Sequence, residues 1–430
     1  MKQPPALIPF SSLSGEQIES HQRYNRMLDD KGRYLPFEEF RHRLKRGDDL
    51  QLAWTLTRRA RDAAIQRIDY FNEAGEQAGF NFTPSIVEVC ALVDIFASQA
   101  AMQKQAASLR GAGAELSALV LEEPITSSQL EGANTTTLVA RNLLESGRNA
   151  RNEDEQMIVG NARLMAEIPN HLSEPLTLDL IRHFHAVGMS GIDDDKYAPG
   201  TFRQTDDVVI ADYDGNIIHQ PPPANLILER LQAVCDVVNN TRGRYIHPLL
   251  RACILHLMIA HEHPFRDGNG RTSRALFYWF MLKNGYEAFR YISISAFLHA
   301  APVKYAHSYQ YTEGDGMDLT YFLDYQASLL VRAVHEYLAH IDELISRRSA
   351  IDRVLFESGA LGRLTSRQVT VLNIMTATPG KLFAAAEIAG SLGISDNTAR
   401  ASIRALVKEG VAEQVRVNDQ QTLYRAKFES

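Results

Sequence analysis

The chain has 430 residues, a length typical of roughly two to four domains. With 45% hydrophobic and 23% charged residues it is neither a disordered chain, a collagen-like fibre nor a disulfide mini-protein, and a net charge of −7 excludes a uniformly basic nucleic-acid coat. Three widely spaced cysteines without a C-x-x-C pair indicate a reducing compartment, and no apolar run approaches the roughly 20 residues of a spanning helix. We therefore expect a soluble, cytoplasmic protein that makes no membrane contact.

The first predicted domain, residues 1–115, reads as helices joined by short polar segments. Residues 51–70 place apolar side chains four positions apart with Arg and Asp between them, which predicts an amphipathic helix. Thr83 is suited to cap a longer apolar helix that we expect over residues 86–109.

The second predicted domain, residues 116–348, is again mainly helical, with one expected interruption. Two β-prone runs, Val208, Val209 and Ile210 followed by Ile217 and Ile218, flank an Asp-Gly dipeptide at 214–215. That pattern predicts a β-hairpin, because Asp-Gly favours the tight turns that join antiparallel strands. The fold class expected from these patterns is mainly α, a helical bundle with one hairpin.

The third predicted domain, residues 360–430, differs in charge and in pattern. Residues 361–430 carry nine Lys or Arg against six Asp or Glu, a net charge of +3, whereas residues 1–360 have 36 − 46 = −10. Expected helices at 366–376, 384–392 and 396–409 precede expected strands at 411–417 and 422–428. This order resembles a winged helix-turn-helix domain.

The last of these helices has two distinct faces. Ala399, Ile403, Leu406 and Val407 form an apolar stripe, and the opposite face carries Asn397, Arg400, Arg404 and Lys408. The basic face is suited to DNA phosphates, and it is equally suited to a solvated surface that binds protein. Both partners stay open at this point.

The stretch from His263 to Arg274, H-P-F-R-D-G-N-G-R-T-S-R, carries the chemistry. It lies between two apolar helices, one expected over 252–260 and one beginning near Asn269. Its glycines allow backbone N–H groups to turn inward at a helix N-terminus, where they bind anions. Arg271 and Arg274 share a helix face and can hold a polyphosphate, Asp267 offers an oxygen ligand for Mg²⁺, and His263 can accept a proton near neutral pH.

A metal site in the same stretch is the competing interpretation. His261, Glu262 and His263 are ligand types, but they are adjacent in the chain and the sequence offers no third ligand nearby. We therefore expect phosphate chemistry rather than a metal cluster there.

The stretch matches H-x-F-x-[D/E]-G-N-G-R-x-x-R at all eight fixed positions and so resembles the Fic family, whose members typically transfer AMP from ATP to a Ser, Thr or Tyr hydroxyl of a target protein. The resemblance implies that His263 is the general base and that Asp267 holds Mg²⁺. It implies a helical bundle whose hairpin, after Gly200-Thr201-Phe202-Arg203, clamps the target as an added strand. The nucleotide-binding residues it implies are Arg266, Asp267, Gly268, Asn269, Gly270, Arg271, Thr272 and Arg274.

A second match lies upstream. Ser127, Glu131 and Gly132 fit [S/T]-x-x-x-E-[G/N], which resembles the inhibitory helix of the family. The resemblance implies that Glu131 neutralises Arg274 and so removes the partner of the ATP γ-phosphate.

Several alternatives stay open. Within the family the enzyme could remove AMP from a modified target or transfer another nucleotide. Many members of the family self-associate, so the resemblance also implies a homodimer. From another class comes a DNA-binding transcriptional regulator whose Fic core senses a nucleotide.

Overall fold

The computed structural model describes residues 2–106, 109, 113–211, 215, 217–239, 244–357, 359–360, 362–376, 380–416 and 422–427. These residues form two compact units, one made of residues up to 102 and 118–335, the other of 103–117 and 336–430. The fold is mainly helical, as expected, and its described strands form three separate two-stranded hairpins. The predicted division into three domains stays a prediction, since the two units do not test it.

The N-terminal part of the first unit is helical except for one hairpin that the sequence analysis did not predict. Residues 66–80, which lie partly in the helix expected over 51–70, instead form this hairpin. The helix stops at Ala64 because the next residues alternate between buried and exposed, the two-residue period of a strand, with Ile68 and Tyr70 inside. The elements are η1 (Phe10–Ser12), α1 (Gly15–Ser20), η2 (Gln22–Tyr24), α2 (Phe37–Phe40), η3 (Arg41–Arg43), α3 (Leu50–Ala64), β1 (Gln66–Phe71) and β2 (Gln77–Phe80).

The apolar helix expected over 86–109 is two helices, α4 (Pro84–Phe96) and α5 (Gln99–Ala106). The predicted cap is confirmed, because the Thr83 hydroxyl accepts from the N–H of Ile86 at 3.2 Å. The break follows from a tertiary contact, since the Gln99 N–H donates to the Gly285 carbonyl at 2.7 Å rather than continuing the helix. Among the described residues no single helix is long and apolar enough to cross a membrane; α4 and the first part of α5 reach that length only as a pair bent by 45°.

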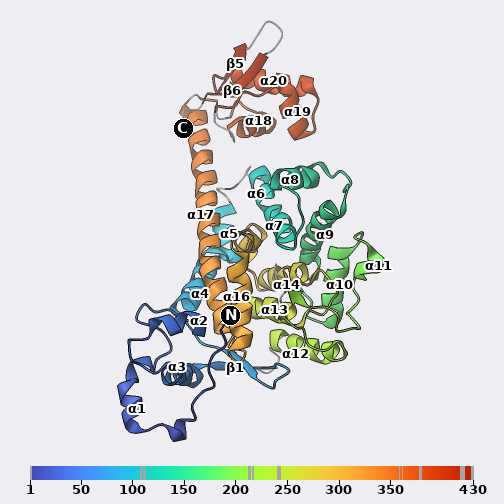
Figure 1. Ribbon diagram of the computed structural model, residues 1–430. Helices are drawn as coiled ribbons and strands as arrows, with labels where there is room; N and C mark the ends of the chain where they lie inside the picture. Colours follow the sequence, from blue (N-terminus) through green and yellow to red (C-terminus); the bar gives the residue numbers. More distant parts are fainter. Residues whose placement is uncertain are drawn as a thin grey trace. The chain divides into compact units, whose positions relative to one another are not determined.

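Two helices, α13 (Pro248–Glu262) and α14 (Asn269–Lys283), lie side by side at the centre of the first unit (Figure 1). Residues on almost every side of both helices are buried, because other helices cover them. The elements from α6 to α16, apart from α13, α14 and the strands of the hairpin described below, are α6 (Gly113–Val120), α7 (Glu122–Leu130), α8 (Thr137–Ser146), α9 (Glu153–Glu167), η4 (Ile168–His171), α10 (Leu178–Met189), α11 (Asp194–Tyr197), η5 (Ala224–Leu226), α12 (Ile227–Asn239), η6 (Glu287–Arg290), α15 (Ser295–Ala300) and α16 (Pro302–Gly314).

The predicted hairpin between α11 and α12 is confirmed but shorter than expected. Strand β3 (Ile210–Ala211) pairs antiparallel with β4 (Ile217–His219), and Ile210 faces His219. Val208 and Val209 precede the strand rather than belonging to it. Of the expected turn only Gly215, with φ 82°, lies within the described residues. We call this hairpin the flap.

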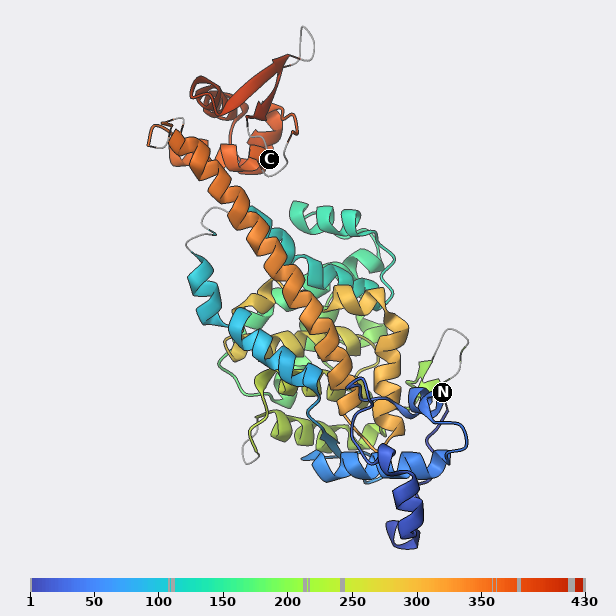
Figure 2. The same ribbon diagram turned by 90° about the vertical axis from the view of Figure 1, so that its left-hand side faces the viewer.

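The helix α17 (Thr320–Glu357) runs uninterrupted for 38 residues (Figure 2). After it the second unit contains α18 (Ser366–Thr376), α19 (Ala385–Leu392), α20 (Asp396–Lys408), β5 (Ala412–Arg416) and β6 (Thr422–Ala426). The predicted order of three helices and two antiparallel strands is confirmed, while the turn expected at 418–421 lies outside the described residues. Ala399, Ile403 and Leu406 are buried in this unit's own core, as predicted.

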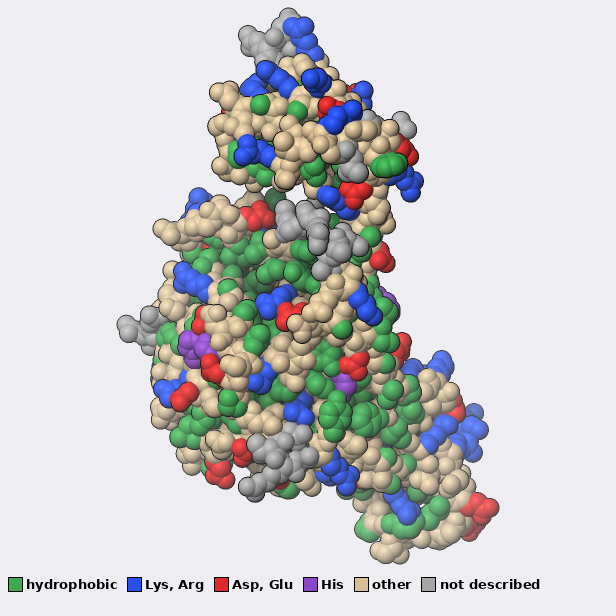
Figure 3. Space-filling view, turned by 180° about the vertical axis from the view of Figure 1, so that it is seen from behind, with side chains coloured by type: hydrophobic (Ala, Val, Ile, Leu, Met, Phe, Trp, Pro, Cys, Tyr) green, Lys and Arg blue, Asp and Glu red, His purple; other side chains and the backbone are tan. Residues whose placement is uncertain are grey.

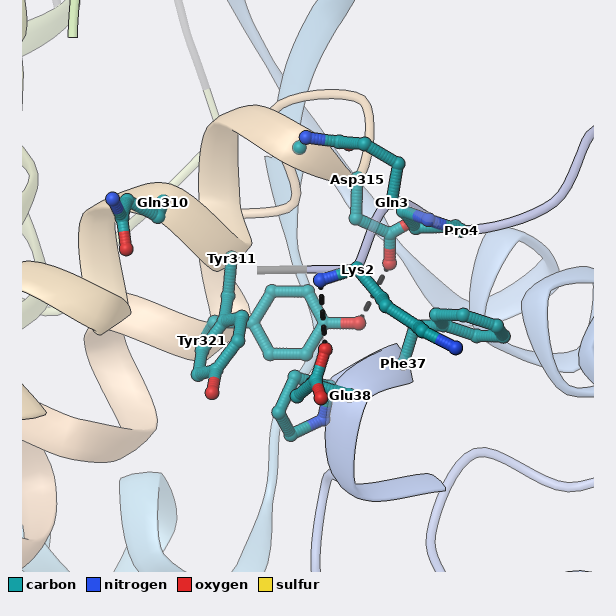
Figure 4. Close-up of a pocket in the computed structure, with 11 residues that line it drawn as sticks. Lys2, Gln3, Pro4, Phe37, Glu38, Gln310, Tyr311, Asp315 and Tyr321 are labelled. Carbon is teal, nitrogen blue, oxygen red and sulfur yellow. Dashed lines mark hydrogen bonds between the residues drawn. The ribbon is translucent and has the colours of Figure 1, made fainter. Parts of the chain in front are cut away.

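The N-terminal segment packs onto α2, α16 and α17 within the first unit (Figure 4). The Lys2 N–H donates to a Glu38 carboxylate oxygen at 2.8 Å, and the Tyr321 hydroxyl donates to Asp315 at 2.6 Å. The cavity enclosed there measures about 20 Å³, room for about one water molecule. These contacts hold the N-terminal segment in place, and the cavity is too small for a ligand.

Candidate functional site

The loop from His263 to Gly268 joins α13 to α14 and is held in one shape by its own side chains. His263 ends α13 in the left-handed region at φ 43°, and Gly268 caps α14 at φ 74°, where a side chain would be strained. The Asn269 amide binds the backbone of Phe265 twice, accepting from its N–H and donating to its carbonyl, both at 2.9 Å. Backbone N–H groups at the start of α14 are therefore fixed toward one point, as an anion site requires.

His185 on α10 holds this loop in place through a hydrogen bond and a ring contact. Its Nδ1 accepts from the N–H of Gly200, so its Nε2 carries the proton and donates to the Asp267 carbonyl, both at 2.9 Å. Its ring stacks on Phe265 with centroids 3.6 Å apart. Burial lowers the pKa of His185 to about 4, and the ring stays neutral in the tautomer that these two bonds need.

His263 is in a form suited to accept a proton. Its Nδ1 lies 3.3 Å from the Ala260 carbonyl, which can only accept, so Nδ1 carries the proton and Nε2 has the free lone pair. Burial lowers the pKa of His263 to about 4, so the ring is neutral at physiological pH. The left-handed backbone at this residue is of the strained kind that concentrates at functional sites.

Arg203 holds that backbone in place. Its guanidinium is buried and donates from Nε to the His263 carbonyl at 2.9 Å, while the Arg203 N–H donates to the Pro264 carbonyl at 2.9 Å. The remaining N–H groups bind the Thr205 and Pro222 carbonyls and the Asp206 carboxylate, which lie on both sides of the flap. One side chain thus joins the flap to the loop.

We expect Arg203→Ala to lower the thermal unfolding midpoint by several degrees. The substitution leaves buried carbonyl groups without donors, at about 1–3 kcal/mol each. Arg182→Ala is the matched control, because that arginine also donates to a loop carbonyl, that of Gly200, but its side chain is 52% exposed. Equal midpoints in the two variants would contradict the assigned role of Arg203.

The anion site proper is lined by two buried arginines. Arg271 is 2% exposed, and its Nε and one terminal nitrogen find no hydrogen-bond partner among the described residues. Because buried N–H groups without a hydrogen-bond partner are costly, these groups suit a bound anion. Asp267 lies beside them with a half-exposed carboxylate, one oxygen 4.0 Å from Arg271 and the other accepting from the Gly268 N–H at 2.6 Å.

Arg274, one turn further along α14, is bound by α7 and by Glu131, the residue that follows α7. It donates from Nε to the Ser127 hydroxyl at 2.8 Å and from a terminal nitrogen to the Ser127 carbonyl at 3.0 Å and to Glu131 Oε1 at 2.8 Å. The Glu131 carboxylate also lies directly against Gly270, where any Cβ would overlap it. The carboxylate therefore occupies space and charge beside the N-terminus of α14.

Of the predicted site residues, the structure brings together Ser127, Glu131 and the stretch from Asp267 to Arg274. The side chain of Arg266 is exposed, and Thr272 is buried within α14. Of the basic face on α20, Asn397, Arg400 and Arg404 are exposed, with Arg400 3.4 Å from Asp396. The sequence analysis missed His185 and Met189, whose sulfur contacts Arg271, because nothing in the local pattern of α10 marks them. They are identified only by their contacts in the folded structure with Asp267 and Arg271, which lie some 80 residues further along the chain.

The structure does not bring His261, Glu262 and His263 together as ligands of one metal ion. These side chains point in different directions: Glu262 is paired with Arg230 at 2.8 Å, and His261 with Glu313 at 2.7 Å. The expectation that no third ligand lies near is wrong for His261, since His219 and Glu313 arrive from distant parts of the chain.

Residues 175–281 match the family model described as Fic/DOC family. A protein adenylyltransferase Fic of Drosophila grimshawi is 29% identical over 164 residues, 36% of this chain and 32% of that protein. The protein adenylyltransferase fic-1 of Caenorhabditis elegans is 36% identical over 66 residues, 15% of this chain and 13% of that protein. The chain thus spans a third or less of these relatives.

A solved Fic family protein from Desulfovibrio desulfuricans has a similar fold. It superposes with a TM-score of 0.55 at 19% identity, covering 81% of this chain and 98% of that one. At this identity the likeness concerns the fold alone.

Proposed function

We propose that the protein is an adenylyltransferase that moves AMP from ATP to a Ser, Thr or Tyr hydroxyl of a target protein, because residues 175–281 match the Fic/DOC family model. The observation that carries this proposal is the pairing of a neutral His263 with the unpaired buried N–H groups of Arg271 at one helix N-terminus. Relatives over the matched region are named protein adenylyltransferases.

In this reaction Nε2 of His263 takes the proton of the target hydroxyl as its oxygen attacks the α-phosphorus. The bond to pyrophosphate breaks in line, and the N–H groups at the start of α14 stabilise the charge on the phosphate oxygens. Arg271 binds the leaving phosphates through its unpaired nitrogens, and Arg274 does so once Glu131 has left it.

Asp267 fits the Mg²⁺ that such a reaction needs. Its carboxylate is a hard oxygen ligand beside the phosphate site, and half of its side chain is open to solvent, which leaves room for the waters that Mg²⁺ keeps. When bound, Mg²⁺ neutralises phosphate charge.

We further propose that Glu131 inhibits the enzyme. As long as its carboxylate holds Arg274 and lies against Gly270, the γ-phosphate has no partner there and is repelled by a like charge. Removal of AMP from a modified target, in which Glu131 would orient water, and transfer of another nucleotide are the alternative reactions at the same site.

The experiment that tests the proposal is incubation of the chain with Mg²⁺ and ATP labelled on either the α- or the γ-phosphate. Label transferred to protein from the α position and not from the γ position establishes AMP transfer. Label transferred only from the γ position would make the enzyme a kinase and contradict the proposal.

Target docking is proposed for the flap. Val209 and Ile217 are 40% and 61% exposed there, an unusual exposure for large apolar side chains beside a reactive centre. A target segment laid along the flap as an added strand would cover them and bring its hydroxyl toward His263.

A second function, DNA binding by the second unit, is favoured by the exposed basic face of α20. Lys and Arg side chains are numerous on that unit (Figure 3), and Asn397, Arg400, Arg404 and Lys408 are all exposed on one side of the helix. A protein partner for this face is the other outcome of the test below.

If the face binds phosphates, duplex DNA should retard the chain at low salt, and retention should weaken as salt rises because counterions are released. Arg400→Ala with Arg404→Ala should abolish it. Arg416→Ala, which removes one charge on the neighbouring strand β5, is the control. If the chain is not retarded at low salt, or if the double variant is still retarded, the face does not bind DNA and a protein partner is the remaining proposal.

A further inference from the structure

A buried cluster of two histidines and one carboxylate lies beside the proposed catalytic loop but takes no part in the proposed reaction. It consists of His219 at the end of β4, His261 in the last turn of α13 and Glu313 near the end of α16. We call it the flap-root cluster. The exposed fractions of the three side chains are 12%, 6% and 24%.

The two imidazoles converge on one carboxylate. Nδ1 of His219 lies 3.0 Å and Nδ1 of His261 lies 2.7 Å from Oε1 of Glu313, and potential ligand atoms of all three residues lie within 4.8 Å of one another. A tetrahedral zinc site with bonds of about 2.0–2.1 Å places ligand atoms about 3.3 Å apart. To accept the ion, the two contacts to Oε1 of Glu313 would have to lengthen from 3.0 and 2.7 Å toward that spacing.

The surroundings match those of a metal-bound histidine. Nε2 of His219 donates to the His261 carbonyl at 2.8 Å, the second hydrogen bond that usually orients a ligating ring. Nε2 of His261 is buried and finds no hydrogen-bond partner among the described residues.

We propose that His219, His261 and Glu313 form a binding site for a divalent transition metal, with Zn²⁺ the best fit. Two imidazoles and one carboxylate are the ligand set of three-ligand zinc sites, which keep a fourth position for water. Imidazole is a poor ligand for Mg²⁺, so the flap-root cluster and Asp267 would take different ions from a mixture.

The bound ion would join three elements that are far apart in the chain. It would fix the end of β4 to α13 two residues before His263, and both to α16. The root of the flap, on which target docking is proposed, would then be held by coordination bonds. Zinc would thus stabilise the fold and set the position of the docking strand.

The test uses the full chain stripped of metal and titrated with Zn²⁺ in the presence of excess Mg²⁺, by calorimetry and by thermal unfolding. We expect one Zn²⁺ per chain and a higher unfolding midpoint. His219→Gln and Glu313→Gln should each weaken binding by about 10- to 100-fold or more. Co²⁺ in place of zinc should give a visible absorption band in the unmodified chain and lose it in both variants.

A matched control exists in the same unit. Glu167, His171 and His183 form a second group of ligand types, but His183 is 42% exposed and His171 is already hydrogen-bonded to carboxylates on both sides. His183→Gln and His263→Ala should leave the zinc stoichiometry and midpoint shift unchanged. His219→Gln and Glu313→Gln test the site independently of each other. If one of them fails to fold, the other still gives a result.

Three results would overturn the proposal: no binding at about 100 μM Zn²⁺, binding retained in both His219→Gln and Glu313→Gln, or binding lost in either control. The first would mean that protons, rather than a metal, join the two histidines to Glu313. None of these results depends on AMP transfer, so the site and the proposed function can fail separately.

Discussion

Glu131→Gly should raise AMP transfer by about 5- to 150-fold, the range of a coupling energy of about 1–3 kcal/mol. The substitution removes the carboxylate that now binds Arg274 at 2.8 Å and blocks the space beside Gly270. Arg274 keeps its bonds to Ser127, so the guanidinium stays in position for the γ-phosphate. The measurement is α-labelled AMP incorporated per folded chain, with ATP and Mg²⁺ in excess.

Glu131→Gln separates charge from volume. The amide is nearly the same size as the carboxylate but cannot neutralise Arg274, so we expect activity between that of the unmodified chain and that of Glu131→Gly. Equal, low incorporation in all three proteins would show that Glu131 does not restrain the enzyme. Unchanged incorporation with a lower unfolding midpoint would make the ion pair structural only.

His263→Ala, introduced into Glu131→Gly, should lower AMP transfer by about 10²- to 10⁴-fold, the usual contribution of a positioned general base. ATP binding should change little, because the anion site consists of Arg271, Arg274 and backbone N–H groups rather than of this ring. Single-turnover labelling and an ATP titration separate the two effects. His183→Ala, a more exposed histidine away from the loop, controls for loss of a histidine as such.

The pH profile offers an independent check on His263. Burial sets its pKa at about 4, so the neutral form that accepts a proton is present above that pH and is lost as pH falls through it. Transfer by Glu131→Gly should therefore not fall near pH 6.5, where an ordinary histidine becomes charged. A steep loss of activity between pH 7 and 6 would show that a group with an unshifted pKa controls the reaction.

The same shift bears on stability. Since the unfolded chain binds a proton near pH 6.5 and the folded one only near pH 4, His263 and His185 both reduce stability as pH falls between these values. At pH 7 and above neither contributes, because both states are neutral there.

The sequence was informative where one short segment carries both structure and chemistry. The helices of the second unit and the glycine-containing turn before α14 could be predicted because glycines, caps and apolar stripes act locally. The roles expected of His263 to Arg274 and of Glu131 came instead from their resemblance to the Fic family. The β1–β2 hairpin and the break after Phe96 could not, because pairing with a partner strand and the contact of Gln99 with Gly285 decide them. His185 and Met189 were missed as parts of the site for the same reason, since their roles depend on residues about 80 positions away.

The close approach of Glu131 to Gly270 limits which mutations could remove the inhibition proposed for Glu131. Any side chain at position 270 would push the carboxylate away and free Arg274, yet it would also intrude on the N–H groups that bind phosphate. Substitutions at position 270 are therefore expected to weaken phosphate binding even where they displace Glu131. A selection for unrestrained enzyme should return changes in the α7 segment, at Glu131 and its neighbours, and almost none in α14.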